Sequence, residues 1–150
     1  GVDPSRLILA DKTSMDEHLA RHKFADLFVD TFVFNAHTTA CEALWAGLPV
    51  VTKIGKGFAA RVTGSLLKAI DLAELITETE LEYETLIFDL ANNPQRLNSI
   101  KERLANNRFS KPLFDTKLFT NHLEDGYQQA YQRYFDGKKP AILYVDKKLI

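Results

Sequence analysis

The sequence predicts an α/β fold in which a parallel sheet is flanked by helices. Short apolar runs alternate with amphipathic segments over residues 5–76, an order typical of successive βα units. The spacing from Ser14 to Glu17, and again from Thr79 to Glu82, matches a capping box that begins a helix. With 45% apolar and 26% charged residues, the 150-residue chain has the composition and length of one globular domain.

Each element of this order has its own signal. We expect strands at residues 7–10, 27–29, 50–52 and 75–76, where apolar runs are short and bounded by polar residues. We expect helices at residues 14–22, 38–46 and 58–70. Gly47 follows the second of these helices and suits a left-handed stop, with Pro49 just beyond it.

From residue 79 onward the chain reads mainly as helix. Helices are expected at 79–92 and from Pro94 onward, where Leu97, Ile100 and Leu104 form an apolar stripe. A polar connection at 106–111 leads to a helix at 116–135, whose aromatic face we expect, like Trp45, to be core. Residues 136–150 form a tail, and to 141–150 we assign no structure. We treat residues 1–150 as a single domain.

The net charge, the length of the apolar runs and the cysteine count limit the partners and the cellular location that we expect. A net charge of −1 gives no reason to expect nucleic acid binding. No apolar run approaches the roughly 20 residues that span a bilayer, so no membrane partner is expected. Cys41 is the single cysteine, which excludes a disulfide within the chain and fits the cytoplasm.

The segment from Asn35 to Val51 carries the strongest functional signal. A polar loop leads to Thr38 and Thr39 at the start of a helix, where free N–H groups and the helix dipole favour phosphate. Glu42 follows one turn later, where a carboxylate accepts hydrogen bonds from the hydroxyls of a ribose. The pattern predicts a nucleotide-diphosphate sugar site. The alternatives are that the threonines only cap the helix and that Glu42 is a solvated surface residue.

Residues 5–135 resemble the C-terminal half of the catalytic region of the O-linked N-acetylglucosamine transferase family, which includes the SPINDLY-type proteins of plants. The matching pieces are Asp16-Glu17-His18, Asp30-Thr31, the block from His37 to Gly47, Ala60-Arg61-Val62 and residues 112–117. The resemblance implies a GT-B fold, with two Rossmann-like halves and the active site between them. This chain would be the donor-binding half of a longer protein.

The resemblance also implies roles for individual residues. His37, Thr38 and Thr39 would contact the donor diphosphate, Glu42 the ribose, and Thr13, His18 and Arg21 the base. Lys56 is a further candidate for the phosphates. The alternatives are that His37 only orients the loop, that His18 is a surface histidine, that Arg21 pairs with Glu17 and that Lys56 is solvated.

Two positions depart from the pattern of the animal members. Met15 replaces a lysine that reaches the nucleoside, and Phe34 replaces a cysteine near the pyrophosphate. Because methionine donates no hydrogen bond, the choice between a UDP-sugar and a GDP-sugar stays open.

The implied reaction is the inverting, metal-independent transfer of N-acetylglucosamine from a UDP donor to serine or threonine of a protein, with no cofactor. We expect no catalytic residue in this chain and no activity from it alone, because the facing half and the tetratricopeptide repeats of the family are not in it. The alternatives are a SPINDLY-like fucosyltransferase with a GDP donor, another GT-B glycosyltransferase, and a non-catalytic nucleotide-binding or interaction module.

Overall fold

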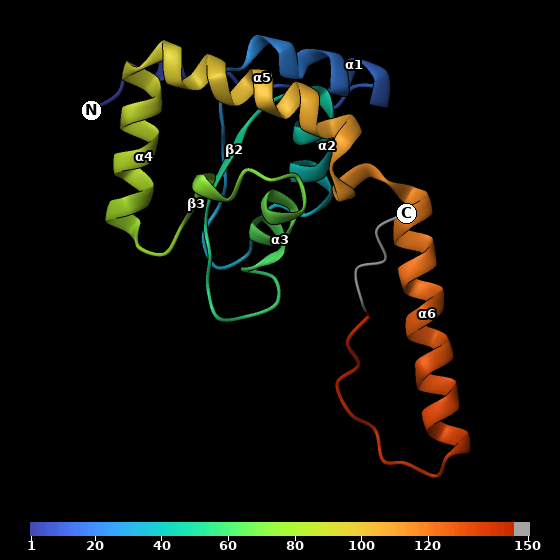
Figure 1. Cartoon of the computed structure of the whole chain (residues 1–150). Coiled ribbons are helices and arrows are strands. Elements are labelled where there is room, and N and C mark those ends of the chain that lie inside the picture. Colours follow the sequence, from blue (N-terminus) through green and yellow to red (C-terminus); the bar gives the residue numbers. More distant parts are fainter. Residues whose placement is uncertain (146–150) are drawn as a thin grey trace.

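The computed structural model describes residues 1–145 and contains a three-stranded parallel sheet in the order β1-β2-β3, with helices packed around it (Figure 1). The strands are β1 (Phe28–Val29), β2 (Val50–Lys53) and β3 (Ile76–Thr77). The helices are α1 (Met15–Arg21), α2 (Thr38–Ala46), α3 (Val62–Ala69), α4 (Glu80–Asn92), α5 (Pro94–Ser110) and α6 (Thr116–Phe135). The predicted α/β class is therefore confirmed. Residues 146–150 of the predicted tail lie outside the described part.

The connections between the strands place two loops at one edge of the sheet. Phe28 of β1 pairs with Val50 of β2, and Thr52 of β2 pairs with Ile76 of β3. Helix α2 joins the first pair of strands and α3 the second, as parallel pairing requires. Because parallel strands end at the same edge, the loops before α2 and α3 lie together there.

The core lies between the sheet and the helices that cover it. Leu44 of α2, Leu67 of α3 and Leu104 of α5 are each 0% exposed. They belong to one cluster with residues of β2 and with Ile70, Leu72, Leu75 and Leu90. The predicted stripe of α5 is buried along its length, so α5 belongs to the same core as the sheet.

Local signals place the helix ends. The capping boxes at Ser14 and Thr79 are both formed, and they begin α1 and α4. Gly47 ends α2 with φ at 89° and its N–H bonded back to the carbonyl of Leu44. Only glycine adopts this left-handed conformation without a steric penalty, so α2 ends where the sequence predicts.

The prediction of a strand at residues 7–10 is wrong. These residues form no regular element, and the side chains of Leu7, Ile8 and Leu9 are 68%, 89% and 95% exposed. Among the described residues no strand pairs with them. A four-residue apolar run does not determine a strand without a neighbour to pair with its backbone.

Three predicted boundaries also differ. Helix α3 begins at Val62 rather than at residue 58, because the segment before it is held in tight turns such as Ala60 N–H to the carbonyl of Gly57. The polar connection predicted at 106–111 is wrong, since α5 continues to Ser110 while Asn107 Nδ2 donates to the carbonyl of Ile70. The last strand is shifted by one residue by a 3-10 turn at Ala73–Leu75.

The aromatic face of α6 is exposed, contrary to prediction. Helix α6 extends away from the sheet (Figure 1), and no residue of it is buried. Tyr127 and Tyr131 are 66% and 67% exposed, and Trp45 of α2 is 45% exposed. The period of the apolar residues is that of a helix face, but in the described structure no element buries this face.

Tyr83 links α4 to the end of β1 and is expected to make stability pH-dependent. Its hydroxyl donates to the carbonyl of Asp30 at 2.6 Å, and burial, together with the nearby Asp30 charge, raises the pKa of Tyr83 to about 12. The unfolded chain loses this proton near pH 10, so the contribution of Tyr83 is complete below pH 10 and is lost as the pH rises toward 12.

The test compares the free energy of unfolding of the chain with that of Tyr83→Phe. At neutral pH the variant is expected to be less stable by about 1 kcal/mol, the value of one hydrogen bond. The difference should shrink between pH 10 and 12, as followed by urea unfolding at each pH. A difference that stays constant over this range would contradict the assignment.

Candidate functional site

The first turn of α2 is open at the edge where β1 and β2 end. His37 is the N-cap residue, but neither its side chain nor any other described side chain caps the helix. Thr38 and Thr39 are exposed, whereas Ala40 is buried against the core. The predicted capping role of the threonines is therefore not observed. An uncapped first turn leaves N–H groups available to an anion.

Three of the predicted site residues lie in contact between α1 and α2. His18 Nε2 is 3.2 Å from Glu42 Oε2, and Arg21 Nη2 is 2.7 Å from His18 Nδ1. The other terminal nitrogen of Arg21 donates to the carbonyl of Asp11 at 2.9 Å. Arg21 is thus engaged by His18 and the Asp11 backbone, and the alternative pairing with Glu17 is wrong.

This chain of contacts indicates which tautomer the His18 ring adopts. Arginine has only donors, so His18 Nδ1 must accept and the ring proton lies on Nε2, from which it is donated to Glu42. Glu42 Oε1 has no partner among the described residues. The carboxylate is therefore oriented by His18, and its second oxygen can accept from a ligand hydroxyl.

The ring of His37 is held between two phenylalanines. It stacks on Phe34 with centroids 4.8 Å apart and meets Phe58 edge-on at 6.2 Å. Its Nε2 lies 3.3 Å from the carbonyl of Ala59, which ties the loop before α2 to the loop before α3. Phe34, one of the departures from the family pattern, thus supports the ring, and this agrees with the alternative that His37 orients the loop.

The remaining candidates lie apart from these contacts. Thr13 and Met15 are exposed at the start of α1, and Thr13 Oγ1 reaches only the carbonyl of Ser14, at 3.4 Å. Lys56 is exposed in the loop between β2 and α3 and makes no hydrogen bond or ion pair with a described residue. The structure does not bring Thr13 or Lys56 into contact with the residues of α2.

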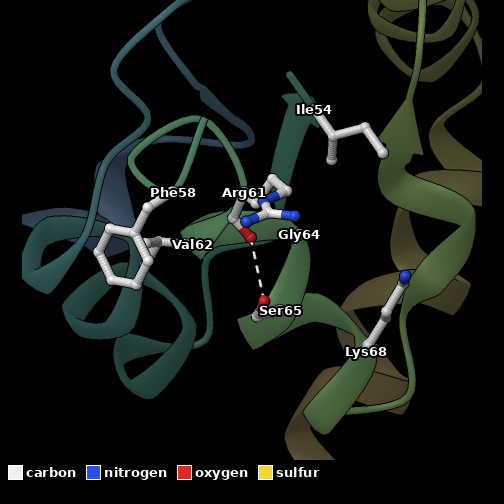
Figure 2. A pocket seen from close by; sticks show the side chains of 7 residues that line it. All are labelled: Ile54, Phe58, Arg61, Val62, Gly64, Ser65 and Lys68. Carbon is white, nitrogen blue, oxygen red and sulfur yellow. Dashed lines mark hydrogen bonds between the residues drawn. The ribbon is translucent and has the colours of Figure 1, made fainter. Parts of the chain in front are cut away.

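A cavity of about 310 Å³ lies beside α3. It is lined by Ile54, Phe58, Arg61, Val62, Gly64, Ser65 and Lys68 (Figure 2). Ser65 Oγ donates to the carbonyl of Arg61 at 3.1 Å. None of the residues predicted to bind the donor lines this cavity, although Phe58 contacts the ring of His37.

The described residues contain neither a candidate metal site nor a candidate membrane-spanning helix. Among residues 1–145 no three His, Cys, Asp or Glu side chains gather in a way that could hold a metal ion. None of the helices in the described part of the chain is both long enough and apolar enough to cross a bilayer.

Comparison with known proteins supplies the family. The model of Glycosyl transferase family 41 matches residues 1–123. The chain belongs to this family. It is 34% identical over 137 residues to the "UDP-N-acetylglucosamine--peptide N-acetylglucosaminyltransferase" of Caenorhabditis elegans, which covers 91% of the chain and 12% of that protein. The match that the resemblance predicted is therefore confirmed.

Two further similarities support the family assignment. The "Probable UDP-N-acetylglucosamine--peptide N-acetylglucosaminyltransferase SEC" of Arabidopsis thaliana is 36% identical over 141 residues, 93% of the chain and 14% of that protein. A solved mutant of the Thermobaculum terrenum O-GlcNAc transferase superposes with a TM-score of 0.83 at 34% identity, over 87% of this chain and 25% of that chain. This family 41 chain thus spans only a small part of the proteins that it matches.

Proposed function

We propose that this family 41 chain is the donor-binding half of a protein O-glycosyltransferase that transfers N-acetylglucosamine from a UDP donor. The observation that carries the proposal is the contact between Glu42 and His18 next to the open first turn of α2. It places an oriented carboxylate one helical turn from free N–H groups. A nucleoside diphosphate presents the complementary groups, a ribose diol and a pyrophosphate.

In the proposed complex the pyrophosphate lies at the first turn of α2. Its negative charge grows as the bond to the sugar breaks, and the N–H groups and the hydroxyls of Thr38 and Thr39 stabilise it. One such donor contributes about 3 kcal/mol to transition-state stabilisation in comparable sites. The positive end of the α2 dipole favours the same charge, so the transfer is proposed to need neither a metal nor a cofactor.

The rest of the enzyme is part of the same proposal. The names of the two relatives describe transfer to a peptide, and we propose a serine or threonine of a protein as the acceptor. The facing catalytic half and tetratricopeptide repeats would be supplied by a longer polypeptide. A cytoplasmic location agrees with the single cysteine.

Calorimetric titration of the chain with UDP and with GDP tests the proposal. Tighter binding of UDP is expected, without transfer of sugar by the chain alone, because we place no catalytic residue in it. Tighter binding of GDP would favour the alternative of a fucosyltransferase with a GDP donor. This alternative stays open because Met15 donates no hydrogen bond to the base. If neither nucleotide binds to the chain or to a longer protein that contains it, the proposed function is wrong.

Replacing Thr38 and Thr39 together by alanine is expected to weaken UDP binding without unfolding the domain. Both side chains are exposed and cap nothing, so the free energy of unfolding should change by less than about 0.5 kcal/mol. Thr116→Ala is a matched control, because Thr116 is also exposed at the start of a helix, one that Asp115 caps. Equal losses of stability and affinity would show a structural role instead.

A further inference from the structure

Asp30 closes the loop between β1 and α2 with a buried carboxylate. The residue is 4% exposed, and its Oδ1 accepts from the backbone N–H of Thr31 at 2.8 Å and of Ala36 at 2.7 Å. Its Oδ2 accepts from Thr52 Oγ1 of β2 at 2.6 Å. One side chain therefore joins the start of the loop, the end of the loop and the neighbouring strand.

Ala36, whose N–H donates to the Asp30 carboxylate, directly precedes His37, the N-cap of α2. The carbonyl of Ala36 accepts from Thr63 Oγ1 of α3 at 2.6 Å, while its N–H is held by Asp30. Both backbone groups of Ala36 are thus bonded to buried side chains from other elements. These two bonds hold the residue from which the chain enters His37 and the first turn of α2.

The loop that Asp30 closes contains a strained turn. Val33 has φ at 69°, and Phe34 N–H bonds to the carbonyl of Phe32 at 2.8 Å across it. This three-residue turn is a rare and strained form, and it is least favourable for a β-branched residue. Strained backbone persists only where the surrounding contacts hold it, and the Asp30 carboxylate bonds on both sides of this turn.

The carboxylate is costly to bury, because it forms no ion pair with a described residue. Its partners are two amides and one hydroxyl, all neutral donors. Bonds to a charged acceptor are shorter and stronger than neutral ones, so the charge holds the loop more firmly than an amide or hydroxyl side chain would. Both carboxylate oxygens are engaged within the protein, Oδ1 by two donors and Oδ2 by one.

We infer that Asp30 is a positioning residue for the diphosphate site, acting through the Ala36 N–H on the first turn of α2. This role rests on the proposed function. Its structural part, that the carboxylate sets the geometry of residues 36–40, does not depend on the identity of the ligand. Nothing in the sequence pattern singled out Asp30 for this role.

The test uses Asp30→Asn and Thr52→Val, with Thr77→Val as the matched control. Thr77 is also a buried strand threonine, and its Oγ1 donates to the carbonyl of Thr52 at 3.0 Å without touching Asp30. Loss of a bond to a charged group is expected to weaken UDP binding about tenfold in the two test variants. Amide hydrogen exchange at Ala36 should become about tenfold faster in them, and the control should change neither quantity.

The results of these measurements distinguish a failure of the positioning role of Asp30 from a failure of the proposed function. If Asp30→Asn does not fold, Thr52→Val still removes one bond of the carboxylate and provides both measurements. Unchanged exchange and affinity in Thr52→Val, relative to Thr77→Val, would overturn the positioning role. Absence of UDP and GDP binding by the unaltered chain and by a longer protein containing it would contradict the proposed function, and the role in donor binding with it. The exchange rate at Ala36 would still show whether Asp30 holds the loop.

Discussion

Glu42→Gln is expected to lower the affinity of the chain for UDP about tenfold or more, the usual loss for a hydrogen bond to a charged group. Glutamine keeps the shape of the side chain but removes the charge and one acceptor oxygen. The change also weakens the bond from His18 Nε2, now 3.2 Å from the carboxylate. Stability should change by less than about 1 kcal/mol, because the pair is partly exposed.

A double-mutant cycle in which the second change is removal of the ribose 2′-hydroxyl tests whether the lost affinity comes from the contact between Glu42 and the ribose. The unaltered chain should bind 2′-deoxy-UDP more weakly than UDP, and Glu42→Gln should bind the two with nearly equal affinity. Glu84→Gln, an exposed glutamate on α4, is the control and should discriminate as the unaltered chain does. If the unaltered chain and Glu42→Gln prefer UDP over 2′-deoxy-UDP to the same extent, the carboxylate does not hold the ribose.

Leu104→Ala is expected to lower the free energy of unfolding by about 2–5 kcal/mol, the range for truncating a buried leucine. Leu104 is 0% exposed and packs in the cluster that includes residues of β2 and α2. Helix α5 is also tied to α2 by Arg108, whose Nη1 donates to the carbonyl of Trp45. Truncation of Leu104 should therefore destabilise the sheet as well as α5.

Urea unfolding measured by two signals checks this prediction. Trp45 is the single tryptophan and reports from α2, whereas far-ultraviolet circular dichroism reports mainly on the helices. The two transitions should coincide and shift together in Leu104→Ala. Leu81→Ala on α4, where the side chain is 74% exposed, should change stability by less than about 0.5 kcal/mol. Separate transitions would show that α5 unfolds independently of the sheet.

The helices that the sequence predicts best are those with local chemical signals at their ends. The capping boxes at Ser14 and Thr79 and the stop at Gly47 act within one turn of the chain. The same holds for the stripe of α5, since its period is a property of neighbouring residues. Such elements need no knowledge of distant contacts.

The residues of the predicted site fall into two groups, those that the fold brings into contact and those that it does not. Glu42 is predicted from the residue pattern as well as from the family resemblance, whereas His18 and Arg21 are predicted from the resemblance alone. The structure brings the three together across α1 and α2. Among the described residues, neither Thr13 nor Lys56 makes a hydrogen bond with these three. The contribution of Asp30 was not predicted, because its three donors come from positions up to 22 residues away in sequence.

From residue 14 onward, the sequence by itself determined the order of strands and helices, most of the helix ends and the position of an open helix terminus after β1, because these depend on backbone conformation and short-range capping. Only the tertiary structure decided which apolar residues are buried, that residues 7–10 form no strand, and how Asp30 holds the loop before α2. Burial and strand pairing require a second surface, and the distance along the chain to that surface is not encoded in any local pattern.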